Sequence, residues 1–121
     1  MTKSKINLKS KLESIKDYWS PKVIAELNNY QFKLAKIKDE FIWHEHKDTD
    51  EAFMVIKGNI EIELEDRTIE LSEGEMFVVP KGAKHKPIAR GEAHIMLIEP
   101  RGVKNTGDIE NELTAKNDIW I

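Results

Sequence analysis

The sequence predicts an all-β fold, an antiparallel sandwich or barrel preceded by one short helix. Two observations carry this prediction. Short runs rich in β-branched and aromatic residues recur along most of the chain, and turn-forming residues separate nearly all of them. Several short strands with turns at such spacing are typical of antiparallel β domains. At 121 residues the chain is long enough for one ordinary domain, so we expect residues 1–121 to form a single domain.

The helix is expected near the N-terminus, over residues 7–17. Leu8, Leu12 and Ile15 recur at the spacing that places side chains on one face of a helix. Asn7 is a residue type that caps helix N-termini, and a proline four residues after position 17 lies beyond the expected end. This helix would pack on the outside of the β domain.

The strands are expected to follow in series. Residues 7–37 would comprise the helix and a first hairpin, residues 38–100 the core of the barrel, and residues 101–121 a polar tail. The last three residues of the tail, Ile119-Trp120-Ile121, are expected to dock onto the body because exposed apolar ends are unfavourable. The expected strands are residues 23–27, 32–37, 41–46, 51–57, 60–64, 68–71, 76–79 and 93–99.

One expected strand is apolar on both faces and needs two covers. In residues 51–57, Phe53 and Val55 share one face, while Met54 and Ile56 share the other. The second cover would be the N-terminal helix or another subunit. We therefore expect a homodimer.

Composition and charge exclude several classes of protein. The 19 basic and 22 acidic residues are interspersed, with a net charge of −3, so the sequence offers no basic surface for nucleic acid. No apolar run approaches the ~20 residues that span a bilayer, and no secretory signal is recognisable, so a cytoplasmic protein is expected. Because the chain has no cysteine, a metal ion would have to be bound by nitrogen and oxygen.

The residues that suggest chemistry are His44, His46, Glu51 and His85. In a strand, alternate side chains point to the same face, so His44 and His46 would converge on one cavity. Glu51 follows after a turn-forming segment, and His85 follows a second turn that contains Pro80. Three imidazoles and one carboxylate in this arrangement indicate a metal site.

These residues also carry a resemblance to a known family. The stretch His44-x-His46-xxxx-Glu51-xxxxxx-Gly58 resembles the first cupin motif, and Gly74-xxxxx-Pro80-x-Gly82-xx-His85 resembles the second. The chain is similar to small single-domain cupins that are often described as mannose-6-phosphate isomerase-like. This resemblance implies a double-stranded β-helix, the jelly-roll barrel of cupins.

The resemblance further implies that His44, His46, Glu51 and His85 are the four metal ligands. Two positions depart from the family pattern: Lys38 replaces an expected glycine, and Ala89 replaces a frequent asparagine. Neither position is a ligand, so the departures would change turn geometry and pocket polarity.

The ligand set suits one divalent transition metal ion per chain, Mn, Fe, Ni, Cu or Zn, with one or two coordination positions left for a small-molecule ligand. The leading hypothesis is a metalloenzyme that acts on a small oxygenated molecule such as a sugar or sugar phosphate, by isomerisation. The alternatives are a metal-dependent dioxygenase and a non-catalytic protein that binds a sugar or metabolite. An isomerase needs a base, and the sequence shows no obvious carboxylate for this role besides Glu51.

Three further residues have two interpretations each. Phe53 would share its strand face with Glu51, so it would line the pocket or pack in the core. His94 would be a hydrogen-bonded strand histidine or an acid–base group. Trp43 would face away from the ligands and pack against another sheet or a partner subunit.

Overall fold

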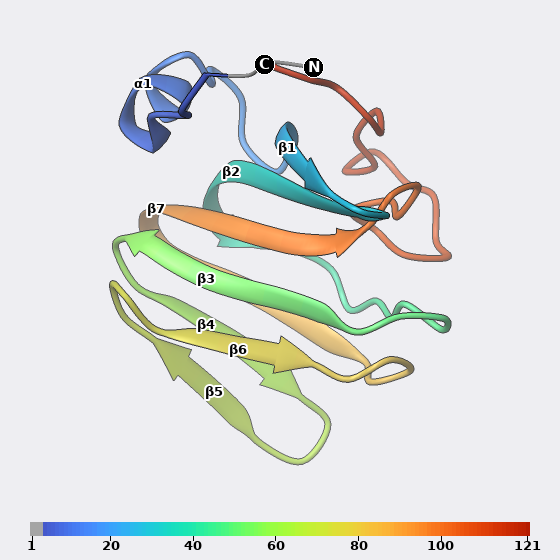
Figure 1. Ribbon diagram of the computed structural model, residues 1–121. Coiled ribbons are helices and arrows are strands. Elements are labelled where there is room, and N and C mark those ends of the chain that lie inside the picture. Colours follow the sequence, from blue (N-terminus) through green and yellow to red (C-terminus); the bar gives the residue numbers. More distant parts are fainter. Residues whose placement is uncertain (1–3) are drawn as a thin grey trace.

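The structure is a computed structural model that describes residues 4–121. It is an antiparallel β-barrel with one short helix on its outside (Figure 1). The elements are α1 (Leu8–Glu13), β1 (Lys22–Leu27), β2 (Tyr30–Glu40), β3 (Glu51–Lys57), β4 (Ile60–Leu64), β5 (Thr68–Leu71), β6 (Met76–Val79) and β7 (His85–Pro100).

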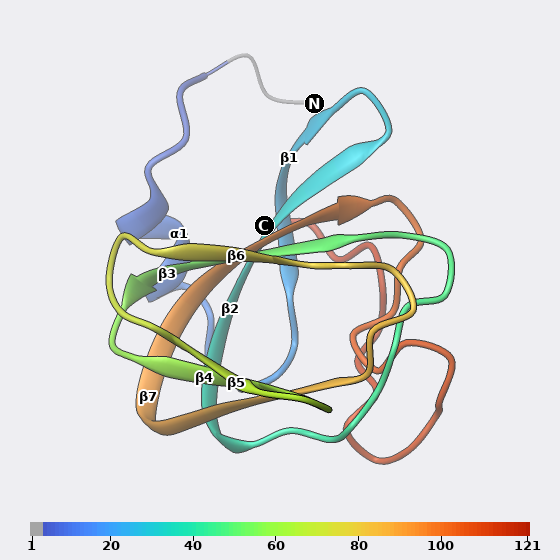
Figure 2. The same ribbon diagram turned by 90° about the horizontal axis from the view of Figure 1, so that it is seen from below.

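Strand β7 organises the barrel because it pairs with three other strands, β2, β3 and β4. Its first half lies against β4, and its second half, from Ala93 onward, lies between β2 and β3. Exposed residues 90–92 separate the two halves. The strand bends strongly in Figure 2 and passes from one layer of the barrel to the other. The remaining pairs, β1 with β2, β3 with β6 and β4 with β5, are also antiparallel.

The expected helix is present but shorter than residues 7–17. Asn7 caps it as predicted, since its side-chain oxygen accepts a hydrogen bond of 3.0 Å from the backbone N–H of Ser10. The helix ends at Glu13, where the N–H groups of Ser14 and Ile15 bond three residues back in a tighter turn. Ile15 is nevertheless buried, so the apolar face that suggested a longer helix continues past the helical backbone.

The strands over residues 51–57, 60–64, 68–71 and 76–79 have the predicted bounds. Two expectations need correction. Residues 41–46 do not form a strand, because only His44 makes a β-bridge there, to His85. Residues 93–99 are the second half of the longer strand β7, which pairs with β2 on both sides of the exposed bend, with a shift of register between Ile37 and Asp39.

The buried apolar residues form two clusters on opposite faces of the sheet. The first fills the barrel and includes Ile37, Phe53, Val55, Ile62 and Ile95. The second lies between the outer face and helix α1. Its buried members are Leu12, Ile15, Ile24, Leu34 and Met96, with Met54 and Ile56 packed against them.

The C-terminal tail docks onto the barrel as predicted. The backbone N–H of Val23 donates to the carbonyl of Ile119 at 2.7 Å, and the N–H of Ile121 donates to the carbonyl of Val23 at 3.1 Å. Trp120 therefore lies beside β1 in a parallel bridge. Among residues 4–121, no helix has the length and apolar character needed to cross a membrane.

Candidate metal centre

The fold brings together the four residues that the sequence singled out. Glu51 is the first residue of β3 and His85 the first of β7, while His44 and His46 lie on the extended segment between β2 and β3. One potential ligand atom of each residue lies within 4.8 Å of the others, and all four residues are buried. The bridge between His44 and His85, with backbone hydrogen bonds of 3.0 and 2.9 Å, joins the two segments.

Backbone carbonyls orient two of the imidazoles. Nδ1 of His44 lies 2.9 Å from the carbonyl oxygen of Ile42, and Nδ1 of His85 lies 2.9 Å from that of Ala83. A carbonyl can only accept a hydrogen bond, so Nδ1 carries the hydrogen in both rings. Their Nε2 atoms then present a lone pair, which is the tautomer that binds a metal ion through Nε2.

The polar atoms at the centre fit a cation. Oε1 of Glu51 lies 3.3 Å from Nε2 of both His46 and His85. With the hydrogen of His85 on Nδ1, its Nε2 and the Glu51 carboxylate are two acceptors in contact, and Nε2 of His46 is buried with no hydrogen-bond partner among the described residues. A buried nitrogen without a partner is costly, and a bound ion would satisfy it together with the neighbouring carboxylate. Residues 44, 46, 51 and 85 could therefore hold a metal ion.

The electrostatics keep the ligands in binding-competent states. Burial, with a smaller contribution from the nearby His85, lowers the pKa of His44 to about 4, so this imidazole is neutral at neutral pH. Burial acts to raise the pKa of Glu51, but its contacts with Glu99, His46 and His85 outweigh burial and hold the pKa well below its usual value. Glu51 is therefore an ionised carboxylate at this site.

A second buried carboxyl group, Glu99, lies behind Glu51 and was missed in the sequence. The two carboxyl groups adjoin each other, and Oε1 of Glu99 is buried with no hydrogen-bond partner among the described residues. Burial and the charge of Glu51 raise the pKa of Glu99 well above its usual value, so Glu99 is the carboxyl group of the two that holds a proton more readily. The other contact of Glu99 is with Lys33, whose Nζ lies 2.6 Å from Oε2. Strand alternation could have revealed both residues, since each occupies an inward-facing position in line with apolar core residues.

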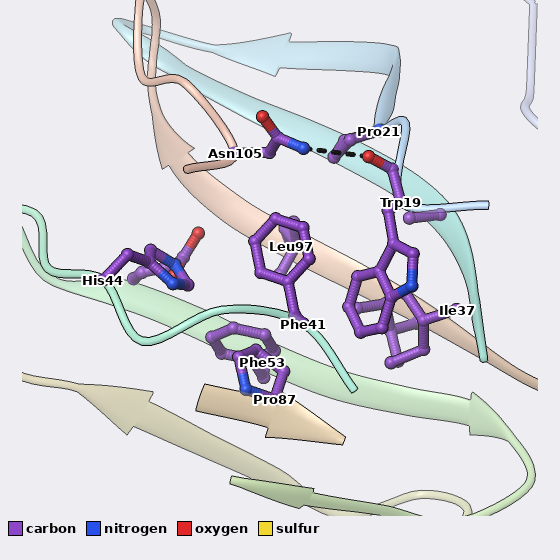
Figure 3. Close-up of a pocket in the computed structure, with 12 residues that line it drawn as sticks. Trp19, Pro21, Ile37, Phe41, His44, Phe53, Pro87, Leu97 and Asn105 are labelled. Carbon is purple, nitrogen blue, oxygen red and sulfur yellow. Dashed lines mark hydrogen bonds between the residues drawn. The ribbon is translucent and has the colours of Figure 1, made fainter. Parts of the chain in front are cut away.

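A narrow, mainly apolar cavity adjoins the ligands (Figure 3). The space inside it that a water-sized molecule can reach is about 30 Å³, so a larger ligand would also occupy the open side of the cavity. His44 and Glu51 are its only titratable lining residues within the described chain. The rest of the lining includes Trp19, Phe41, Phe53, Leu97 and Asn105.

Aromatic rings form one wall of this cavity. Trp19 and Phe41 are stacked with centroids 4.6 Å apart, and Phe41 meets the ring of His44 edge-on at 5.3 Å. Trp19 has a φ of 59°, which is rare for a bulky residue. The indole N–H of Trp19 donates to the carbonyl of Lys38 at 2.9 Å. Asn105 Nδ2 donates to the backbone carbonyl of Trp19 at 2.9 Å, as drawn in Figure 3.

The structure bears on the three residues that had two interpretations. Phe53 is buried, belongs to the core and also lines the cavity, so both interpretations hold for it. Nε2 of His94 lies 2.7 Å from a Glu92 oxygen, and His94 does not line the cavity beside the candidate ligands. Trp43 is 42% exposed, with Lys86 Nζ 5.9 Å from the centre of its ring, and its contact with a partner subunit stays a prediction.

Comparison with known proteins agrees with this geometry. The sequence model of the cupin domain matches residues 32–99, more than half of the chain. A crystal structure of a cupin-2 domain protein from Shewanella frigidimarina is 54% identical, with a TM-score of 0.78 over 79% of this chain and 94% of that one.

Two further relatives extend the likeness. A crystal structure of a protein from Neisseria meningitidis is 35% identical, with a TM-score of 0.74 over 80% of this chain and 99% of that one. The uncharacterized protein YdbB of Bacillus subtilis is 32% identical over 81 residues, which is 66% of this chain and 72% of that protein. This chain belongs to the cupin family.

Proposed function

We propose that this protein is a metal-dependent cupin enzyme that acts on a small, largely apolar molecule, and that its reaction consumes dioxygen. The observation that carries the proposal is the cavity beside the ligands, which is lined by aromatic and aliphatic side chains. A bound transition metal ion would act as a Lewis acid and, if it were iron or copper, could activate dioxygen.

The residues of the chain would bind and orient the substrate. The stacked rings of Trp19 and Phe41 offer a flat wall for a planar molecule, and Phe53 and Leu97 add apolar contact. A narrow cavity of this kind would also exclude bulk water from the reacting atoms. His44 and Glu51 form its polar end, so a substrate oxygen would lie at that end.

The same lining favours oxygen chemistry over sugar isomerisation. Within the described chain, neither lysine nor arginine lines the cavity, so a sugar phosphate would find no cation there for its charge. An isomerase also needs a base separate from the metal ligands, whereas the titratable residues of the lining, His44 and Glu51, both belong to the proposed ligand set. Dioxygenation requires no such base. The isomerase hypothesis stays a prediction, and the residues that line the cavity argue against it.

The cupin fold is compatible with dioxygenase chemistry. A hydroquinone 1,2-dioxygenase from Sphingomonas shares it, with 17% identity and a TM-score of 0.74 over 80% of this chain and 32% of that one. This likeness concerns the fold alone, so the argument for the reaction depends on the cavity and the ligands.

The test is to load the metal-free protein separately with Fe²⁺, Mn²⁺, Ni²⁺, Cu²⁺ and Zn²⁺ and to measure dioxygen consumption with a panel of aromatic diols. We expect a redox-active ion to support dioxygen consumption with at least one diol, and we expect no reaction when sugar phosphates are supplied instead. The matched control is the double variant His44→Ala/His46→Ala, which should be inactive. Isomerisation of a sugar phosphate by the wild type would overturn the proposal.

A non-catalytic cupin is the remaining alternative, and the same panel distinguishes it. Such a protein would bind a diol, as shown by calorimetry, and return it unchanged with every metal ion. The homodimer, the cytoplasmic location and the small-molecule ligand predicted from the sequence also stay predictions. Sedimentation, cell fractionation and calorimetry, respectively, would test them.

A further inference from the structure

Lys33 and Glu99 form a buried pair of an amino group and a carboxyl group, at the end of the barrel that contains the candidate metal centre. Their side chains are 3% and 2% exposed, and Lys33 Nζ lies 2.6 Å from Glu99 Oε2. Neither residue lines the cavity beside the candidate ligands. Burial of such groups away from water is costly, and a buried pair of this kind is seldom a source of net stability by itself. The pair therefore calls for an explanation other than the stability of the fold.

Strand register explains why the pair adjoins Glu51. In β3 and β7, Phe53 pairs with Leu97 and Ala52 with Ile98, so the next step of this register sets Glu51 opposite Glu99. Both side chains then point to the same inner face of the barrel, where the two carboxyl groups adjoin each other. Lys33 pairs with Leu97 from the other side of β7, so it reaches Glu99 diagonally on the same face.

The contacts continue from Lys33 to the C-terminal tail. Its Nζ donates to the carbonyl oxygen of Val103 at 3.2 Å and to Oδ1 of Asn117 at 3.5 Å. A connected series of polar contacts thus runs from the tail through Lys33 and Glu99 to Glu51, whose Oε1 faces His46 and His85.

We propose that Lys33 and Glu99 are positioning residues that hold the Glu51 carboxylate in the orientation required for metal binding. A carboxylate with free rotation could turn its oxygens away from the imidazoles. Glu99 would prevent this rotation because its own position is fixed by Lys33. Lys33 is fixed in turn by its contacts with the C-terminal tail. Partners behind a ligand commonly contribute 10- to 100-fold to metal affinity.

The experiment measures binding of Co²⁺ alone, by competition with a chelator and by the visible absorption of the bound ion. In the double variant Lys33→Met/Glu99→Leu, apolar side chains replace both partners, so neither Lys33 nor Glu99 is left buried without the other. We expect this variant to fold and its Co²⁺ affinity to fall about 10- to 100-fold, with a changed absorption spectrum.

A conservative variant and a matched control complete the design. Glu99→Gln keeps a donor toward Glu51 and an acceptor for Lys33, so its affinity and spectrum should remain close to those of the wild type. Met96→Leu alters a buried residue of the same strand on the opposite face of the sheet, and should leave the spectrum unchanged. If the double variant does not fold, Lys33→Met alone should show a smaller loss of affinity.

The proposal is overturned if folded Lys33→Met/Glu99→Leu, or Lys33→Met in its place, binds Co²⁺ with wild-type affinity and spectrum. It is also overturned if Glu99→Gln loses as much affinity as the double variant. The inference rests on the metal-binding part of the proposed function and not on the reaction. A wild type that binds Co²⁺ but consumes no dioxygen would contradict only the reaction, whereas a wild type that binds no metal would contradict both.

Discussion

The two faces of strand β3 differ in the kinds of side chain that they bury. On the inner face, Glu51 is followed by Phe53 and Val55, so one row of side chains contains both a candidate metal ligand and the centre of the barrel core. On the outer face, Met54 and Ile56 pack against the apolar cluster under helix α1. The inner face is enclosed by strands and contains charged groups, whereas the outer face is covered by one short helix.

This difference shows how a small barrel separates stability from chemistry. Buried polar groups are tolerated inside where the sheet places a partner beside them, as it places Lys33 beside Glu99. The outer cluster carries no such requirement. We therefore expect inner substitutions to alter both stability and metal binding, and outer ones to alter stability alone.

The largest expected effect is a loss of folding stability that differs between two neighbouring residues on opposite faces of β7. Ile95→Ala should lower the free energy of unfolding by about 4 kcal/mol, because the strands around it cannot close the resulting cavity. Met96→Ala should cost about 2 kcal/mol, because the six-residue helix α1 can shift toward the gap. Urea unfolding of the metal-free proteins measures both. Equal losses would refute the distinction between the faces.

The next largest effect is a pH dependence of the folding stability, which arises from His44 at the candidate metal centre. The pKa of His44 is 6.5 in the unfolded chain and about 4 in the folded one, so the unfolded chain binds more protons between these values. The contribution of His44 is thus complete above pH 6.5 and is lost as the pH falls toward 4, by about 3 kcal/mol in total. Urea unfolding of the metal-free protein across this range measures it.

The matching variant is His44→Gln, whose stability should fall less steeply over the same pH range. The difference between the two slopes isolates His44 from the other titrating groups. Identical slopes for wild type and variant would show that His44 does not have the lowered pKa.

A slightly smaller effect is expected from metal addition. An ion that binds only the folded state, supplied at about 100 times its dissociation constant, should stabilise it by about 2.7 kcal/mol. Thermal unfolding with and without Co²⁺ measures this gain. Met96→Ala should retain it, and His44→Ala/His46→Ala should lose it. A gain that persists in the double variant would place the ion elsewhere.

The smallest effect is expected at an outer position that α1 does not cover. Met76 of β6 is 51% exposed, so Met76→Thr should change the free energy of unfolding by less than about 0.5 kcal/mol. Thermal unfolding at several protein concentrations tests this. A larger loss that depends on concentration would show that a second copy covers this face, as the predicted homodimer would require.

Much of the fold could be predicted because it depends on local patterns. The alternation in residues 60–64 and the turns beside it set strand bounds that the structure reproduces, and Asn7 caps the helix as expected. The segment 41–46 shows where alternation misleads. His44 and His46 do converge with Glu51 and His85, but through an irregular segment tied by one bridge rather than through a strand.

The sequence by itself determined the β class, most strand bounds and the four residues of the candidate centre, because side-chain periodicity and motif spacing are local properties. Only the tertiary structure decided that Trp19 and Asn105, from opposite ends of the chain, line the cavity. It alone also placed Lys33 and Glu99 behind Glu51. These arrangements depend on strand pairing across long sequence separations, which no local pattern specifies, and they decide what the centre can bind.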